Sequence, residues 1–133
     1  MKKKICIVIA NYYPKVSKDL LIGTNLVLKK SKNITSKIVY VPGIFEIPII
    51  ISKNLKGFDG FIALGCVIKG ETPHFDFISS STFNAIMHLS VTYKKPIGNG
   101  IITCLNKKQA LERSNPNKKN KGGESAKALL SVL

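Results

Sequence analysis

The feature that most constrains this chain is the regular alternation of short β-branched runs with longer helical stretches. Apolar runs predict buried strands at residues 4–10, 37–41, 61–64 and 97–105. Apolar residues with helical spacing predict helices at 16–30, 46–55, 78–93, 106–112 and from 122 to 133. Crossovers between parallel strands are nearly always right-handed, so this order predicts a four-stranded parallel sheet with helices on both faces. We therefore expect a three-layer α/β/α fold.

Length and cysteine content limit the class of protein. At 133 residues the chain has the commonest size of one domain, so we expect a single domain over residues 1–133. No apolar run approaches the roughly 20 residues of a membrane helix, and the segment before the first strand is too short for a signal peptide. We expect a cytoplasmic protein. The three cysteines are too far apart for a disulfide framework or a paired-thiol metal site, so we expect no metal.

The formal net charge of +14 raises the question of nucleic-acid binding. The lysines are scattered outside 2–4 and 118–121, and no nucleic-acid-binding motif is present, so a basic nucleic-acid-binding module remains only an alternative. A sugar phosphate is an equally suitable anion. Among the 21 basic residues Arg113 is the only arginine. Its guanidinium could bind phosphate through two parallel hydrogen bonds, or it could be an ordinary residue of a helix surface.

Ligands of such sheets bind beyond the carboxyl ends of the strands, so the segments after Ala10, Val41 and Gly65 are the candidate site. Tyr12, after the first strand, could stack on a flat ring or pack at the edge of the sheet. Glu46, after the second strand, could bind a ligand or only favour the positive end of a helix dipole. The residue types alone do not decide between the two interpretations of Tyr12, nor between the two interpretations of Glu46.

The segment after the third strand carries the most chemistry. Gly70 permits a sharp turn, and the amides of Glu71 and Thr72 can form an anion-binding concavity. His74 can take and give a proton near neutral pH, and Asp76 could orient its ring. A helix-capping or surface histidine is the simpler interpretation of His74 alone. The cysteine of this segment, Cys66, and the second histidine, His88, also require an interpretation.

Cys66 with His74 could be a thiol nucleophile and its base. Cys6 and Cys104 lie inside apolar runs and are expected to act as small hydrophobic residues. His88 lies in mid-helix beside the apolar stripe and is expected to be structural.

Three motifs together resemble one family. They are Val-Pro-Gly-Ile-Phe-Glu-Ile-Pro at 41–48, Leu-Gly-Cys-Val-Ile-Lys-Gly-Glu-Thr-Pro-His-Phe-Asp at 64–76, and Gln-Ala-Leu-Glu-Arg at 109–113 followed by Asn-Lys-Gly at 120–122. In this order and spacing they resemble lumazine synthase over nearly the whole chain.

This resemblance implies a flavodoxin-like fold and the penultimate step of riboflavin biosynthesis, catalysed without cofactor or metal. The reaction condenses 5-amino-6-(D-ribitylamino)uracil with 3,4-dihydroxy-2-butanone 4-phosphate to 6,7-dimethyl-8-ribityllumazine, releasing phosphate and water. The resemblance makes His74 the proton-transfer residue. It also implies substrate contacts by Tyr12, Ile44, Phe45, Glu46, Cys66, Val67, Ile68, Glu71, Thr72, Asn99, Arg113 and Lys121.

By the same resemblance, Tyr12 is expected to stack on the pyrimidine and residues 44–46 to line the ribityl chain. Residues 66–68 are expected to meet the pyrimidine edge through their backbone. The resemblance also implies that Glu71 and Thr72 bind the phosphate, that Arg113 is the second phosphate clamp and that Lys121 contacts substrate.

The resemblance also implies assembly. Arg113 would reach into the site of a neighbouring subunit, which predicts a homopentamer or a multiple of it, with no membrane and no specific nucleic acid as partner. Asn11, Tyr13 and Asn99 depart from the residues usual in the family, and the chain begins at its first strand, without the N-terminal arm of many members. An archaeal-type riboflavin synthase, which shares the fold and consumes lumazine, is the related alternative.

Overall fold

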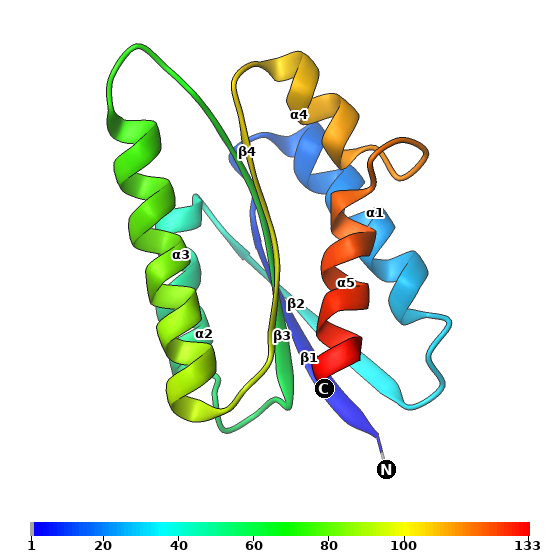
Figure 1. Cartoon of the computed structure of the whole chain (residues 1–133). Coiled ribbons are helices and arrows are strands. Elements are labelled where there is room, and N and C mark those ends of the chain that lie inside the picture. The colour runs from blue at the N-terminus through cyan, green and yellow to red at the C-terminus, as the bar shows by residue number, and fades with distance from the viewer. Residues whose placement is uncertain (1) are drawn as a thin grey trace.

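Four parallel strands form the central sheet of this computed structural model, which describes residues 2–133 (Figure 1). In chain order they are β1 (Lys3–Ala10), β2 (Ile34–Val41), β3 (Gly60–Ile68) and β4 (Ile97–Cys104). Their order across the sheet is β2-β1-β3-β4, and every neighbouring pair is parallel. The predicted three-layer α/β fold with a four-stranded parallel sheet is confirmed.

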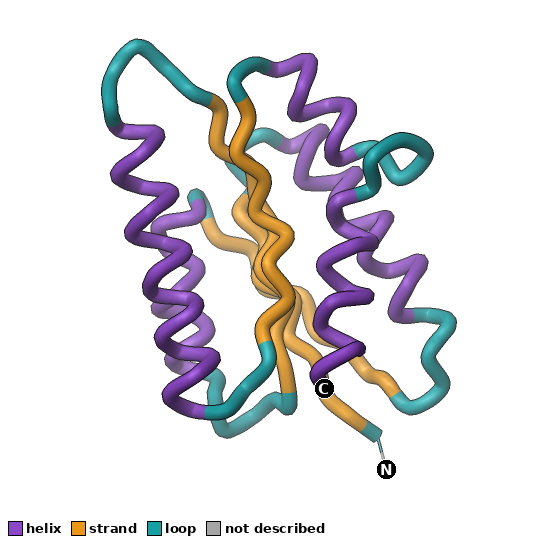
Figure 2. The backbone as a smooth tube through the Cα atoms, viewed as in Figure 1, coloured by secondary structure: helices purple, strands orange, loops and turns teal. Residues whose placement is uncertain are grey.

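Five helices cover the two faces of the sheet, as Figure 2 shows. One face carries α2 (Ile47–Lys53) and α3 (His74–Tyr93), together with the short 3-10 helix η1 (Ile44–Glu46). The other face carries α1 (Pro14–Leu28), α4 (Lys107–Ser114) and α5 (Lys121–Val132). None of these helices is long and apolar enough to span a membrane.

The position of β1 inside the sheet, between β2 and β3, explains why its sequence is apolar at consecutive positions. Ile5, Ile7 and Ile9 face the core under α1, α4 and α5, whereas Cys6 and Val8 face the core under α2 and α3. A strand buried on both faces cannot alternate apolar and polar residues. Packing on both faces of the sheet therefore fixes the positions at which β1 and β3 end, at the carboxyl edge of the sheet.

The strand β3 continues beyond the predicted end at Leu64. It pairs with β4 from Phe61 opposite Ile97 to Ile68 opposite Cys104, so the backbone stays extended through Gly65. A Cβ atom at Gly65 would lie 2.8 Å from Ile44 Cγ2, so the glycine allows η1 to pack closely against the strand. The glycine thus marks a close contact, and its interpretation as a strand end was wrong.

Other boundaries shift by a few residues. β2 begins at Ile34, because it pairs with β1 from Lys3 onward. The predicted helix 46–55 is divided into η1 and the shorter α2. Asn106 caps α4 as predicted, and its Oδ1 accepts a hydrogen bond from the Gln109 amide at 2.9 Å.

The helix α5 begins at Lys121, one residue before the predicted glycine start. Asn120 caps it with a left-handed backbone (φ 49°), and its Oδ1 accepts a hydrogen bond from the Gly123 amide at 3.2 Å. A Cβ atom at Gly122 would clash with the Leu20 carbonyl oxygen, so the glycine allows α5 to lie against α1. This close packing fixes the place of Lys121 beside α4.

Candidate active site

A cavity of about 270 Å³ opens at the carboxyl edge of the sheet, where β1, β2 and β3 end. It holds seven of the residues expected from the sequence: Tyr12, Ile44, Cys66, Val67, Ile68, Thr72 and His74. Tyr13, Gly43, Gly70, Phe75 and Ile78 complete its lining. The segments expected from the strand-end rule therefore line one cavity. We call it the strand-end cavity.

Two tyrosines form one wall of the strand-end cavity. Their ring centroids are 4.9 Å apart with planes at 74°, an edge-to-face contact. Tyr13 is half-buried against the core under α1, and burial raises the pKa of its hydroxyl. Tyr12 is 70% exposed, so its ring is supported by Tyr13 while much of its surface remains free for a ligand.

The turn after β2 combines a structural role for Glu46 with a position beside the cavity. Glu46 Oε1 accepts a hydrogen bond from the Gly43 amide at 3.0 Å, and the Glu46 amide donates to the Gly43 carbonyl at 3.2 Å. This reciprocal pair fixes η1, so Ile44 is buried and Phe45 is 65% exposed. Phe45 lines a hollow of about 450 Å³ that adjoins the strand-end cavity and shares His74 with it.

The segment after β3 turns into α3 at His74. Pro73 precedes the helix, and the Thr72 hydroxyl accepts a hydrogen bond from the His74 amide at 3.4 Å. His74 is exposed and belongs to both cavities, so its imidazole is accessible to a ligand in either. Glu71 and Asp76 are also exposed, and neither is among the residues that line these two cavities.

The remaining three expected residues lie together elsewhere. Asn99, Arg113 and Lys121 line a groove of about 360 Å³ between β4, α4 and α5. We call it the β4 groove. Arg113 Nη1 donates a hydrogen bond to the Thr103 carbonyl at 2.7 Å, and Lys121 Nζ lies 3.2 Å from Glu124 Oε2. Asn99 Oδ1 accepts a hydrogen bond from the Ile101 amide at 3.1 Å.

The strand-end cavity and the β4 groove share no lining residue. In Figure 1, α4 and α5 lie on the opposite side of the sheet from α3, whose first residue is His74. One copy of the chain therefore does not bring Arg113 into the cavity that holds His74.

The cysteines differ from expectation in one respect. Cys66 lines the strand-end cavity but is only 6% exposed, and a hydrogen bond with Cys104 together with burial raises the pKa of its thiol. A protonated, buried thiol is a poor nucleophile, which weakens the interpretation of Cys66 and His74 as a nucleophile and base. Within residues 2–133, no three His, Cys, Asp or Glu side chains cluster in a way that could hold a metal ion.

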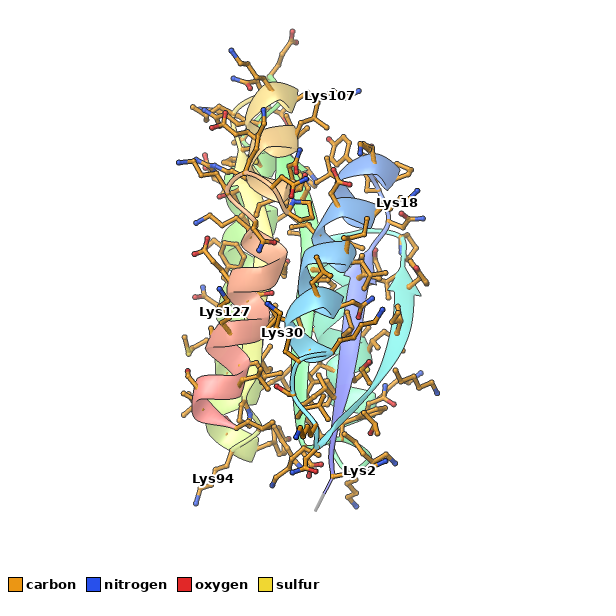
Figure 3. The ribbon with its side chains drawn as sticks, turned by 90° about the vertical axis from the view of Figure 1, so that its right-hand side faces the viewer. Lys2, Lys18, Lys30, Lys94, Lys107 and Lys127 are labelled. Carbon is orange, nitrogen blue, oxygen red and sulfur yellow. The ribbon has the colours of Figure 1, made fainter. Side chains whose placement is uncertain are left out.

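Some features of the site and surface were not singled out from the sequence. Phe75 and Ile78 line the strand-end cavity, and their only signal is their place in the first turns of the helix that begins at His74. His88 lines a groove of about 410 Å³ between α2 and α3, which shares Phe45 and Ser81 with the hollow beside the strand-end cavity. The lysines are spread over the length of the molecule, as the labelled ones in Figure 3 show: Lys2, Lys18, Lys30, Lys94, Lys107 and Lys127.

Comparison with known proteins agrees with the geometry. The family model of 6,7-dimethyl-8-ribityllumazine synthase matches residues 2–133. A 6,7-dimethyl-8-ribityllumazine synthase of Bartonella tribocorum is 43% identical, over 100% of this chain and 91% of the relative. That of Bartonella bacilliformis is 42% identical (97% and 87%), and that of Agrobacterium fabrum is 40% identical (99% and 93%). The chain therefore belongs to the 6,7-dimethyl-8-ribityllumazine synthase family.

Proposed function

We propose that this chain condenses 5-amino-6-(D-ribitylamino)uracil with 3,4-dihydroxy-2-butanone 4-phosphate in the strand-end cavity, forming 6,7-dimethyl-8-ribityllumazine with loss of phosphate and water. Its family makes it a transferase of riboflavin biosynthesis. The observation that carries the proposal is the convergence of Tyr12, Thr72 and His74 on one cavity at the ends of different strands. An aromatic ring, an anion-binding turn and a titratable imidazole are the groups that this condensation needs.

The backbone of β3 supports the place of the pyrimidine. Pairing with β1 ends at Leu64, whereas pairing with β4 continues to Ile68. Beyond Leu64 the backbone groups of β3 on the β1 side have no strand partner in this register and border the cavity. Through these backbone groups, Cys66, Val67 and Ile68 hydrogen-bond to the edge of the uracil, in the same way as the edge of a sheet binds an additional strand. Tyr12 stacks on the same ring.

The ribityl chain and the phosphate occupy the two ends of the site. Ile44 and Phe45 provide apolar contacts to the ribityl chain, and Glu46 accepts hydrogen bonds from its hydroxyl groups. Thr72 and Glu71 bind the phosphate, largely through amides of the turn after β3. These contacts hold the aromatic amine against the ketone of the sugar phosphate.

The chemistry requires positioning and proton transfer. The amine is already a nucleophile, and attack on the ketone, phosphate elimination and ring closure each move protons between neighbouring atoms. Holding both substrates in reactive geometry can supply about 7–11 kcal/mol of the barrier. His74 transfers the protons, which adds roughly 10²–10⁴-fold.

The site is completed by a second copy of the chain. Asn99, Arg113 and Lys121 of an adjacent copy face the strand-end cavity, with Arg113 as the second phosphate clamp and Lys121 as a further substrate contact. Two observations support this: the β4 groove carries the needed cations, and it is separate from the cavity of its own chain. A head-to-tail contact repeated around a closed ring gives a homopentamer or a multiple of it.

The proposal includes a cytoplasmic location, supported by three reduced, buried thiols among the described residues.

The direct test is to mix the purified protein with both substrates and follow the absorbance of the lumazine. The proposal expects product only when both substrates are present. Product absent at every protein concentration would refute it. Lumazine supplied alone is the matched control, because an archaeal-type riboflavin synthase would consume it and this enzyme would not.

A further inference from the structure

Two buried thiols, Cys66 and Cys104, lie on the neighbouring strands β3 and β4. In the register of β3 and β4, Cys66 is opposite Ile102 and Ile68 is opposite Cys104. The two cysteines are therefore offset by two positions on neighbouring strands and face the same side of the sheet. Both belong to the core under α1, α4 and α5, with Cys66 6% and Cys104 1% exposed. The proposed chemistry uses neither thiol.

The side chain of Arg113 ends beside Cys104. Its Nη1 donates to the carbonyl of Thr103 at 2.7 Å, and the peptide that carries this carbonyl joins Thr103 to Cys104. The guanidinium therefore lies against the last peptide of β4, next to the residue that carries the thiol. Two groups act on this sulfur: the neutral Cys66 thiol of β3, through a hydrogen bond, and the charged Arg113 of α4.

We propose that Cys104 is a positioning residue for Arg113: its sulfur and the Thr103 carbonyl hold one edge of the guanidinium, and the Cys66 thiol donates to the same sulfur. This inference rests on the proposed function, in which Arg113 binds the phosphate of the substrate. It assigns a role to a thiol that the sequence pattern presents as an ordinary core residue.

The electrostatics of the pair fit this arrangement. The hydrogen bond from Cys66 lowers the pKa of the Cys104 thiol below its ordinary value, and the charge of Arg113 acts in the same direction against the effect of burial. A sulfur that shares negative charge is a better acceptor for a guanidinium than a neutral thiol. An arginine has five N–H donors, so fixing one edge leaves the other free to bind phosphate. It also removes rotational freedom that phosphate binding would otherwise have to restrict.

The test compares steady-state constants of Cys104→Ala, Cys104→Ser and a matched control, Cys6→Ala. Cys6 is fully buried in the same sheet but faces the opposite core, under α2 and α3. Cys104→Ala is expected to raise KM for the sugar phosphate about tenfold, as loss of a hydrogen bond to a charged group does. KM for the pyrimidine and kcat should stay within about twofold, and Cys104→Ser, which keeps a neutral acceptor but cannot take up negative charge, should restore only part of the loss.

Two results would overturn the inference. One is a sugar-phosphate KM in Cys104→Ala that equals that of wild type or of Cys6→Ala. The other is a fall in kcat with both KM values changed alike, which indicates general damage to the fold. If wild type itself makes no lumazine, the proposed function fails, and the contact between Cys104 and Arg113 is then decided by a second measurement.

That measurement needs no activity and no Cys104 variant. The ultraviolet absorbance of the thiolate is titrated in wild type and in Arg113→Gln, each as the full-length protein. The inference expects a thiolate midpoint below the ordinary thiol value in wild type and a higher midpoint in Arg113→Gln, because the neighbouring positive charge is lost. An identical midpoint in both proteins would overturn it.

Discussion

Replacing Arg113 and His74 by alanine should damage catalysis in two different ways. Arg113 uses Nη1 for the Thr103 carbonyl, which leaves its other N–H groups available for the phosphate contact that we propose. Loss of a hydrogen bond between charged groups costs about 1.5–3 kcal/mol, which corresponds to a roughly 10- to 150-fold increase in KM for the sugar phosphate. Because the amine is an intrinsic nucleophile, kcat should change much less.

His74→Ala should show the converse pattern. In the proposed mechanism its imidazole transfers protons and does not bind the phosphate as an ion pair, so kcat should fall by roughly 10²–10⁴ with a small change in KM. The assay varies each substrate at saturating concentrations of the other and follows lumazine absorbance. Arg113→Lys, which keeps the charge but loses the planar fork, should lie between wild type and Arg113→Ala. Equal effects of Arg113→Ala and His74→Ala on the sugar-phosphate KM would refute the reasoning.

Three further predictions concern stability. Gly65→Ala places a Cβ 2.8 Å from Ile44 Cγ2, so overpacking should lower the free energy of unfolding by about 1–3 kcal/mol in urea titrations and weaken substrate binding. An unchanged free energy of unfolding together with unchanged substrate binding would contradict this prediction, because it would show that η1 can shift away without cost. Gly122→Ala should cost more, because the new Cβ meets the backbone carbonyl of Leu20 and neither helix can yield alone; equal midpoints of the two variants would contradict this. Burial raises the pKa of the Cys6 thiol to about 11 from about 9. As the pH rises, the unfolded chain therefore loses this proton before the folded protein does. The free energy of unfolding should fall between pH 9 and 11, by up to about 3 kcal/mol. Cys6→Ala should lack this part of the decline, and an identical pH profile would exclude it.

The fold was predictable because its signals are local. The continuous apolar run of β1 reports burial on both faces, and Asn106 reports a helix start through its own side chain. The end of β3 was not predictable in this way. Gly65 has the same appearance in a turn and in a strand, and only the pairing with β4 and the contact with Ile44 distinguish the two.

For the candidate site, the sequence could predict which residues lie together only in part. Tyr12, Thr72 and His74 meet because parallel strands end at one edge of the sheet, so position after a strand was sufficient to group them. Arg113 follows the fourth strand as well, yet its helix lies on the other face, and no local pattern encodes that separation. Cys66 and Cys104 lie near each other because of the register between β3 and β4, which no local sequence pattern indicates.

The central claim is that each site joins the strand-end cavity of one copy to the β4 groove of the next. It is tested most directly by mixing His74→Ala with Arg113→Ala after dissociation and reassembly. In a head-to-tail ring formed from equal amounts of both, about one quarter of the sites would combine an intact cavity with an intact groove. The account predicts recovery of activity toward about a quarter of wild type, with each variant reassembled alone as the control. A mixture no more active than the sum of the two variants would contradict it.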